Sequence, residues 1–296
     1  LREAPLRIVP RGDHTHGVEK RQQPPPAQDK LVKCALGLLG KLDRVHEQVT
    51  DFIAEQVDAA GAEGAVLGLS GGIDSTTVAY LAVDALGAEN LRGLVMPGSV
   101  NTEEKMSDAE RVAEELGIDY DVIEIEPIAE AFYDALPAAA DERLAESNVR
   151  VRVRAVLNYF AANADGRLVL GTGNRSEALT GYFTKYGDGA VDCNPLGNLY
   201  KQQVRQLAAH AGVPHDLVMK TPSAEMWTGQ TDEEELGLDY DTLDAVLALH
   251  VDGPLSTAAT VRALDVTEEQ VARVEELYES SKHKRAMPPA PAELTL

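Results

Sequence analysis

Two hydrophobic patterns follow one another along the chain. Between residues 29 and 60, apolar side chains recur every three or four positions, the period of one helix face, and this predicts one long helix. From residue 65 onwards, short apolar runs alternate with stretches of helical period. The runs predicted as strands cover 65–69, 91–96, 120–125 and 167–171. Strands that alternate with helices predict a parallel sheet with helices on both faces.

Helical periodicity also marks the stretches between and after these strands. The helices predicted within the sheet region cover 74–86, 103–116, 127–136 and 141–162. Those predicted beyond the last strand cover 200–210, 239–250, 256–264 and 267–281. Residues 220–237 are polar and irregular, and this segment is long enough to suggest a functional loop. We therefore expect an α/β fold, a doubly wound parallel sheet with a helical C-terminal part.

The two ends of the chain lack this periodicity. Residues 1–28 include a run of three prolines beside glutamines, and are predicted to be a disordered tail. Residues 290–296 are predicted to be a loose C-terminus. The segment between them, 29–289, is predicted to form a single domain.

Charge narrows the classes of function. The chain has 27 basic and 49 acidic residues, a formal charge of −22 and a pI near 4.6. Such a surface repels phosphate backbones, so we expect no nucleic-acid partner. No stretch of about 18 apolar residues or secretion signal is seen, so we expect no membrane partner and a cytoplasmic location. The acids are spread along the folded part, which favours a salt-adapted protein over an ordinary acidic enzyme.

The two cysteines, Cys34 and Cys193, do not suggest covalent or metal chemistry. Two thiols cannot form a disulfide framework, and without a histidine cluster they cannot form a zinc site. Either could be claimed as an amidotransferase nucleophile, but no glutaminase-sized segment accompanies them. Both are interpreted as small packing residues.

A glycine-rich turn follows the first predicted strand. It runs Gly68-Leu69-Ser70-Gly71-Gly72-Ile73-Asp74-Ser75 and leads into a predicted helix. Glycines allow backbone amides to approach an anion, and the helix N-terminus adds its dipole, an arrangement that suits pyrophosphate. A carboxylate beside phosphates is explained if Asp74 holds a divalent cation, although an Asp that merely caps the helix is the alternative. The pattern lacks the Gly-Lys-Ser/Thr of a Walker A loop and the Gly-X-Gly-X-X-Gly of dinucleotide folds.

Two further segments follow the last predicted strand, at the edge where ligands gather in open α/β sheets. The first is Gly171-Thr172-Gly173-Asn174-Arg175-Ser176-Glu177. Its Glu177 should lie on the first turn of a helix, where it can share Mg²⁺ with Asp74. The second, 181–192, mixes glycines with aromatic and charged residues, and is typical of a binding loop rather than a solvated one.

The Ser-Gly-Gly-X-Asp-Ser turn resembles the signature of the ATP pyrophosphatase superfamily, whose members adenylate a substrate and release pyrophosphate. Together with the two later segments and Lys282-His283-Lys284-Arg285, it resembles the bacterial and archaeal NAD synthetases from about residue 29 to 289. This resemblance implies an adenine nucleotide α-hydrolase-like fold. GMP synthetase and tRNA-lysidine synthetase share the first motif only.

The resemblance also implies residue roles. ATP would contact Gly68, Leu69, Ser70, Gly71, Gly72, Ile73, Asp74, Ser75, Thr172, Lys201 and Ser223. Mg²⁺ would bind Asp74 and Glu177, and Asp74 and Lys201 would be catalytic. The deamidated dinucleotide, deamido-NAD, would contact Arg152, Lys185, Asp192, His283 and Lys284. Because Arg152 belongs to a run with Arg150 and Arg154, any of the three could be the contact.

The implied reaction needs no protein nucleophile. The nicotinate carboxylate of deamido-NAD attacks the α-phosphorus of ATP, pyrophosphate leaves, and ammonia attacks the NAD-adenylate to give NAD and AMP. The resemblance further implies a homodimer, and the long first helix is expected to supply its apolar surface. About 60 residues precede the phosphate loop, too few for a glutaminase domain, so ammonium is the expected nitrogen donor. Another adenylating ligase and a nucleotide-binding regulatory module are the alternatives, and the paired Asp74 and Glu177 argue against the second.

Overall fold

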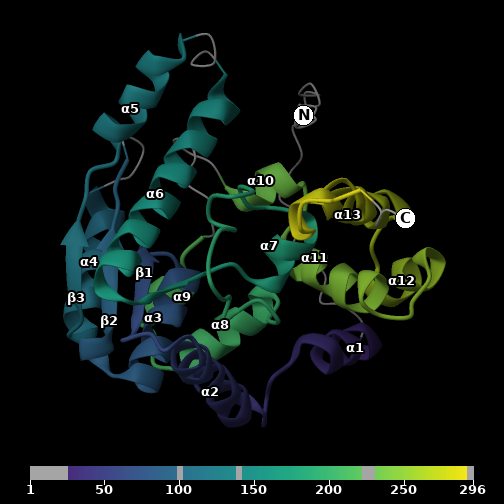
Figure 1. Cartoon of the computed structure of the whole chain (residues 1–296). Helices are drawn as coiled ribbons and strands as arrows, with labels where there is room; N and C mark the ends of the chain where they lie inside the picture. The colour runs from purple at the N-terminus through teal and green to yellow at the C-terminus, as the bar shows by residue number, and fades with distance from the viewer. Residues whose placement is uncertain (1–25, 99–102, 138–141, 222–230, 292–296) are drawn as a thin grey trace, which may run out of the picture.

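The computed structural model describes residues 26–98, 103–137, 142–221 and 231–291 (Figure 1). Most of the predicted tail and of the predicted loose C-terminus therefore lies outside the described residues. Helix α1 (Pro26–Leu36) includes positions 26–28, so the tail prediction is wrong for these three residues. Proline is tolerated at the start of a helix because its missing amide hydrogen would have no partner there.

Four parallel strands form the central sheet, in the order β3-β2-β1-β4. They are β1 (Ala65–Leu69), β2 (Leu91–Val95), β3 (Asp119–Val122) and β4 (Leu168–Leu170). Ala65 of β1 lies opposite Leu91 on one side and Leu168 on the other. The four predicted strands and their parallel arrangement are confirmed. Strand β1 is central, so the turn that follows it opens near the middle of the sheet edge.

Helices cover both faces of the sheet, as the alternation of strands and helices predicted. Alternate side chains of β1 point to opposite faces, so Leu67 belongs to one apolar core and Val66 to another. The core around Leu67 is completed by α2 (Leu42–Ala60), α3 (Ile73–Leu86), α4 (Glu103–Leu116) and α8 (Lys201–His210). The core around Val66 includes residues of α6 (Arg143–Asp165), which packs against α5 (Glu126–Ala135).

The predicted long first helix is in fact two helices. Helix α1 ends at Leu36 and α2 begins at Leu42. Gly40, in the turn between them, has a φ of 75°, a left-handed conformation that glycine adopts at little cost. The apolar period persists across the break because α1 packs on the C-terminal helices while α2 packs on α3 and α8.

The C-terminal part is helical, as predicted, and lies beside the sheet region with α7 (Arg175–Thr180) and α8 between them (Figure 1). Its core is formed mainly by α11 (Tyr240–Val246), its π-helical continuation η3 (Leu247–Val251), and α13 (Glu268–Ser280). The remaining elements are η1 (Ala88–Asn90), α9 (His215–Val218), α10 (Asp232–Leu236), α12 (Thr257–Leu264) and α14 (Lys282–Arg285). Helix α10 falls within the segment predicted to be irregular, which is wrong for those five residues. Among the described residues, no helix is both long and apolar enough to cross a membrane.

Candidate active site

The glycine-rich turn after β1 is a closed loop held by its own serines. Ser70 Oγ and Ser75 Oγ lie 3.0 Å apart, and the Gly72 amide donates to Ser70 Oγ over 3.2 Å. Gly71 has a φ of 71°, which requires a residue without a side chain, and Gly72 is the N-cap of α3. The first turn of α3 therefore presents its unpaired amides beyond the end of β1, the arrangement expected for an anion site.

A cavity of about 520 Å³ opens over this loop. It extends from the end of β1 past α6 and α7 to the junction of α13 and α14. Of the predicted ATP-contacting residues, all but Gly71 and Ser223 line it: Gly68, Leu69, Ser70, Gly72, Ile73, Asp74, Ser75, Thr172 and Lys201. Ser223 lies outside the described residues.

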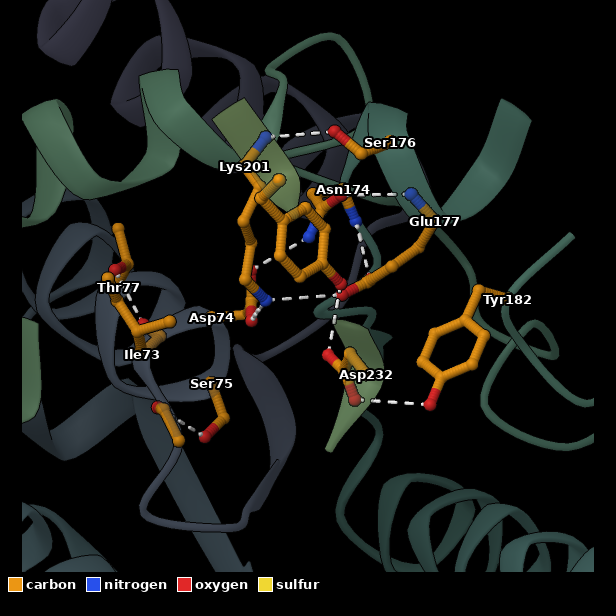
Figure 2. Close-up of polar contacts among 12 residues, drawn as sticks. Ile73, Asp74, Ser75, Thr77, Asn174, Ser176, Glu177, Tyr182, Lys201 and Asp232 are labelled. Atoms are coloured by element: carbon orange, nitrogen blue, oxygen red, sulfur yellow. Dashed lines mark hydrogen bonds and ion pairs between the residues drawn. The ribbon is translucent and has the colours of Figure 1, made fainter. Parts of the chain in front are cut away.

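Three charged side chains from three different helices meet in this cavity (Figure 2). The Lys201 ammonium lies 2.5 Å from Asp74 Oδ2 and 3.3 Å from Glu177 Oε1. Asp74 and Lys201 stand in the first turns of α3 and α8, and Glu177 in that of α7. Lys201 as a whole is 2% exposed. Asp74 and Glu177 thus both contact the Lys201 ammonium, and their sharing of Mg²⁺ stays a prediction.

Asn174 fixes both carboxylates from the N-cap position of α7. Its side-chain oxygen accepts the Glu177 amide at 3.1 Å, and the Glu177 carboxylate accepts the Asn174 amide at 3.2 Å. This reciprocal pair is a capping box. The Asn174 Nδ2 also donates to Asp74 Oδ1 at 3.0 Å (Figure 2). Asn174 was not predicted as a site residue, although Asn three positions before Glu is a recognisable cap signal.

Burial shapes the electrostatics of this cluster. The pKa of Glu177 rises to about 8, first because burial penalises its charged form and then because Asp74 lies beside it, against the lowering effect of Lys201. Burial alone would lower the pKa of Lys201, but the charges of Asp74 and Glu177 raise it above its usual value. A cation that binds Glu177 would therefore have to displace its proton, because metal ligands bind in the deprotonated form.

The donor set fits Mg²⁺ of the kind that is shared with a nucleotide. Carboxylate oxygens are the hard ligands that Mg²⁺ prefers, and it is commonly held by one or two carboxylates together with substrate phosphates. Within the described residues, no group of three or more His, Cys, Asp or Glu side chains could hold a metal alone. Asp74 and Glu177 could supply two such ligands beside phosphate oxygens.

A second buried carboxylate, Asp232, lies behind this cluster and was missed by the sequence analysis. The Tyr240 hydroxyl donates to its Oδ2 at 3.0 Å and the Tyr182 hydroxyl lies 3.1 Å from its Oδ1 (Figure 2). The Tyr240 ring also lies 5.2 Å from the Lys201 ammonium, within range of a cation–π interaction. No local motif marks Asp232, which stands in a run of four acids that reads as a solvated surface.

The predicted dinucleotide residues are more dispersed. His283 and Lys284 line the cavity, whereas Arg152, Lys185 and Asp192 are not among its lining residues. The Arg152 guanidinium donates to the Lys185 carbonyl at 3.1 Å, and the Lys185 ammonium to the His283 carbonyl at 2.5 Å. Asp192 accepts the Val169 amide at 2.8 Å and the Tyr159 hydroxyl at 3.1 Å.

The three arginines of the 150–154 run on α6 have separate partners. Arg150 pairs with Glu126 at 2.7 Å, and the Arg154 Nε donates to the Met96 carbonyl at 3.0 Å. Arg154 lines the cavity, while Arg152 reaches the 181–192 segment through Lys185. The geometry therefore brings Arg152 next to the predicted binding loop and sets Arg154 in the cavity wall against the end of β2.

Comparison with known proteins gives consistent results. The family model described as NAD synthase matches residues 45–288. A relative from Halobacterium salinarum, named NH(3)-dependent NAD(+) synthetase, is 63% identical over 246 residues, 83% of this chain and 92% of the relative. A relative of the same name from Archaeoglobus fulgidus is 48% identical over 248 residues, 83% of this chain and 96% of that one.

Solved structures agree with the sequence relatives. The structure titled NMN synthetase from Francisella tularensis has a TM-score of 0.76 and 34% identity, covering 86% of this chain and 99% of that one. The NH3-dependent NAD synthetase from Campylobacter jejuni has a TM-score of 0.70 and 30% identity, covering 85% and 99%.

Proposed function

Because this chain belongs to the NAD synthase family, we propose that it is an ammonia-dependent NAD synthetase. It is an ATP-dependent ligase that forms a C–N bond. It converts deamido-NAD and ammonia into NAD through an NAD-adenylate, and releases AMP and pyrophosphate. ATP is a cytoplasmic co-substrate, so we also propose a cytoplasmic location.

The observation that carries this proposal is the buried cluster of Asp74, Lys201 and Glu177 above the phosphate loop. Attack of the nicotinate carboxylate on the α-phosphorus of ATP builds negative charge on the departing pyrophosphate. The Lys201 ammonium and the amides at the start of α3 would stabilise that charge. Catalysis of this kind depends on positioning and electrostatics, and needs no covalent enzyme intermediate.

Asp74 and Glu177 would hold Mg²⁺ together with the phosphates of ATP. When bound, Mg²⁺ supplies charge neutralisation on the leaving pyrophosphate. The glycine-rich turn and Thr172 would bind ATP, as would Ser223. Arg152, Lys185, Asp192, His283 and Lys284 would bind deamido-NAD, although Asp192 also ties β4 to α6 through Val169 and Tyr159.

The homodimer is also part of this proposal, but its surface differs from the one expected. Apolar side chains of α1 and α2, such as Leu36 and Ile53, are buried within the chain. Several exposed apolar side chains lie on α5 and α6, where Phe160 is 74% exposed, Val156 67% and Phe132 55%. We propose that this face binds a second copy. Phe160→Ser should convert a dimer into a monomer in light scattering, and a wild-type monomer at micromolar concentration would contradict the assignment.

The nitrogen donor provides the test of the function. The purified chain should make NAD from ATP, Mg²⁺, deamido-NAD and ammonium, and turnover should rise with pH because only neutral ammonia is nucleophilic. Glutamine should give negligible turnover. Comparable rates with glutamine, lost in Cys34→Ala or Cys193→Ala, would contradict the ammonia-dependent assignment. Pyrophosphate release that does not require deamido-NAD would indicate another adenylating ligase.

A further inference from the structure

Asp244 is a buried carboxylate that neither lines the cavity nor belongs to any motif of the sequence. It lies on α11 and is 0% exposed. Its Oδ1 accepts the Ser176 hydroxyl at 2.5 Å, and its Oδ2 accepts the Gln202 backbone amide at 2.8 Å. Asp244 therefore contacts the first turns of both α7 and α8.

One partner of Asp244, Ser176, is also hydrogen-bonded to Lys201, the residue before the other partner, Gln202. The Lys201 amide donates to Ser176 Oγ at 3.0 Å (Figure 2). Asp244, Ser176 and the Lys201–Gln202 backbone thus form a closed ring of three hydrogen bonds. Ser176 directly precedes Glu177 and Gln202 directly follows Lys201. Each anchor is one residue from a side chain that faces the cavity.

The chemistry of this position requires two acceptors in a fixed orientation. A carboxylate can accept a hydroxyl and an amide at once, whereas an amide side chain has one acceptor and one donor. The Gln202 amide lies in the first turn of α8, where negative charge is also favoured by the helix dipole. Burial nevertheless raises the pKa of Asp244 to about 6, against the lowering effects of Ser176 and Gln202. Keeping the Asp244 carboxylate ionised in the fold therefore costs free energy.

We propose that Asp244 is a positioning residue for the ligase reaction, because its link between α7 and α8 sets the Lys201 ammonium against Glu177 and Asp74. The inference rests on the proposed function. Asp244 does not line the cavity, and acts through the two helix ends that carry Glu177 and Lys201.

A second link between the same helices lies nearer the surface. Asp252 accepts the Arg175 guanidinium at 2.8 Å and the Tyr200 hydroxyl. The Arg175 amide also donates to the Leu199 carbonyl at 2.8 Å. These contacts also join α7 to α8. Loss of Asp244 should therefore loosen the first turns of the two helices without separating them.

The test uses Asp244→Asn, Ser176→Ala and their combination in the full chain. A displacement of about 1 Å in a catalytic group can cost about 100-fold in rate, so each single variant should lower kcat by about 10- to 100-fold. The KM for deamido-NAD should stay within about twofold, because the dinucleotide residues are untouched. Both changes break the same ring of hydrogen bonds. The kcat of the double variant should therefore be close to the kcat of the less active single variant.

A second readout does not depend on turnover. Mn²⁺ binding, followed by its paramagnetic signal with an α,β-methylene analogue of ATP, should weaken by about tenfold in both single variants, since Glu177 is no longer fixed. The matched control is Asp239→Ala, which removes the N-cap bond to the Thr242 amide on the same helix. This control should lower the melting temperature and leave kcat and Mn²⁺ binding unchanged.

The outcomes separate this inference from the proposed function. A wild-type chain that makes no NAD would overturn the function. An active wild type with unchanged kcat and Mn²⁺ binding in Ser176→Ala and Asp244→Asn would overturn the positioning role, as would a lowered melting temperature alone. If Asp244→Asn does not fold, Ser176→Ala decides the question, because its hydroxyl bridges both other members of the ring.

Discussion

The two ends of the cavity are built in different ways. Around the phosphate loop, the cation Lys201 is buried and lies between two carboxylates, which are themselves fixed by Asn174. Around the 181–192 segment, the cations Arg152 and Lys185 bind backbone carbonyls, and their chain of contacts runs along the surface to His283. The end at the phosphate loop is a preorganised ion cluster. Beside the other end, Arg152 and Lys185 are oriented by backbone carbonyls, and among the described residues neither forms an ion pair with a carboxylate.

This difference indicates how the two ends would work. A buried ion cluster keeps its arrangement when charge develops on a leaving group, which is the requirement for electrostatic catalysis. A carbonyl orients a cation but does not neutralise it, so Arg152 and Lys185 keep their charge for an anionic substrate. In a chain with a formal charge of −22, such positive groups also help to attract a dinucleotide. The first end should control kcat and the second KM.

The largest expected effect comes from the buried end. Asp74→Asn and Glu177→Gln should each lower AMP formation by about 1,000-fold, equivalent to about 4 kcal/mol of transition-state stabilisation, because a metal ligand is lost. Circular dichroism should show the fold intact. Asp84→Asn on the same helix, which removes only an exposed contact with His46, should retain activity. Near-normal turnover of either site variant would show that the cluster is not needed for catalysis.

The opposite end should respond in KM. Lys185→Met should raise the KM for deamido-NAD by about tenfold, about 1.4 kcal/mol, and change kcat by less than about threefold, since it removes binding energy only. Lys282→Met is the control, because this lysine pairs with Glu279 at the surface. A changed kcat with an unaltered KM in the steady-state kinetics of Lys185→Met would contradict the assignment of KM to this end.

Burial of the Asp244 carboxylate should appear in the pH dependence of the free energy of unfolding. Asp244 has a pKa of about 6 in the fold, above the value of about 3.9 expected in the unfolded chain. A raised carboxyl pKa means that the folded state binds the proton more tightly, so its stabilisation is present at low pH and is lost as pH rises through 6. Relative to Asp244→Asn, the wild type should lose about 1.4 kcal/mol of unfolding free energy between about pH 5 and pH 7.5. Denaturant titrations with a pH-independent difference would contradict this value.

Salt should act on the exposed parts more than on the buried cluster. At low ionic strength the acidic surface is poorly screened, with a Debye length of about 30 Å at 0.01 M. The Halobacterium salinarum relative agrees with a salt-adapted surface. Dilution of KCl from about 2 M to about 0.05 M should lower the melting temperature by about 3 °C, close to 1 kcal/mol for a domain of this size. Dimer and activity lost on dilution should return when KCl is restored. An unchanged melting temperature and full activity in dilute buffer would favour an ordinary acidic enzyme.

The sequence was enough to predict the features that depend on residues close together in the chain. The strand pattern predicted all four strands, and Asp74 and Glu177 each stand in a short motif that follows a strand. Asp232 and Asp244 could not be found in this way, because Tyr182 is 50 residues from Asp232, Ser176 is 68 from Asp244, and only the fold brings these residues together. The break at Gly40 was missed because two helices that bury different faces can share one continuous apolar period.

The central claim is that the nicotinate carboxylate attacks the α-phosphorus of ATP at the buried cluster. It is tested most directly with deamido-NAD whose carboxylate carries heavy oxygen. When ammonia displaces AMP from the adenylate, one carboxylate oxygen leaves with the AMP. Mass spectrometry should therefore find one heavy oxygen in AMP and none in pyrophosphate. Unlabelled AMP, or ADP and phosphate as the products, would contradict the account.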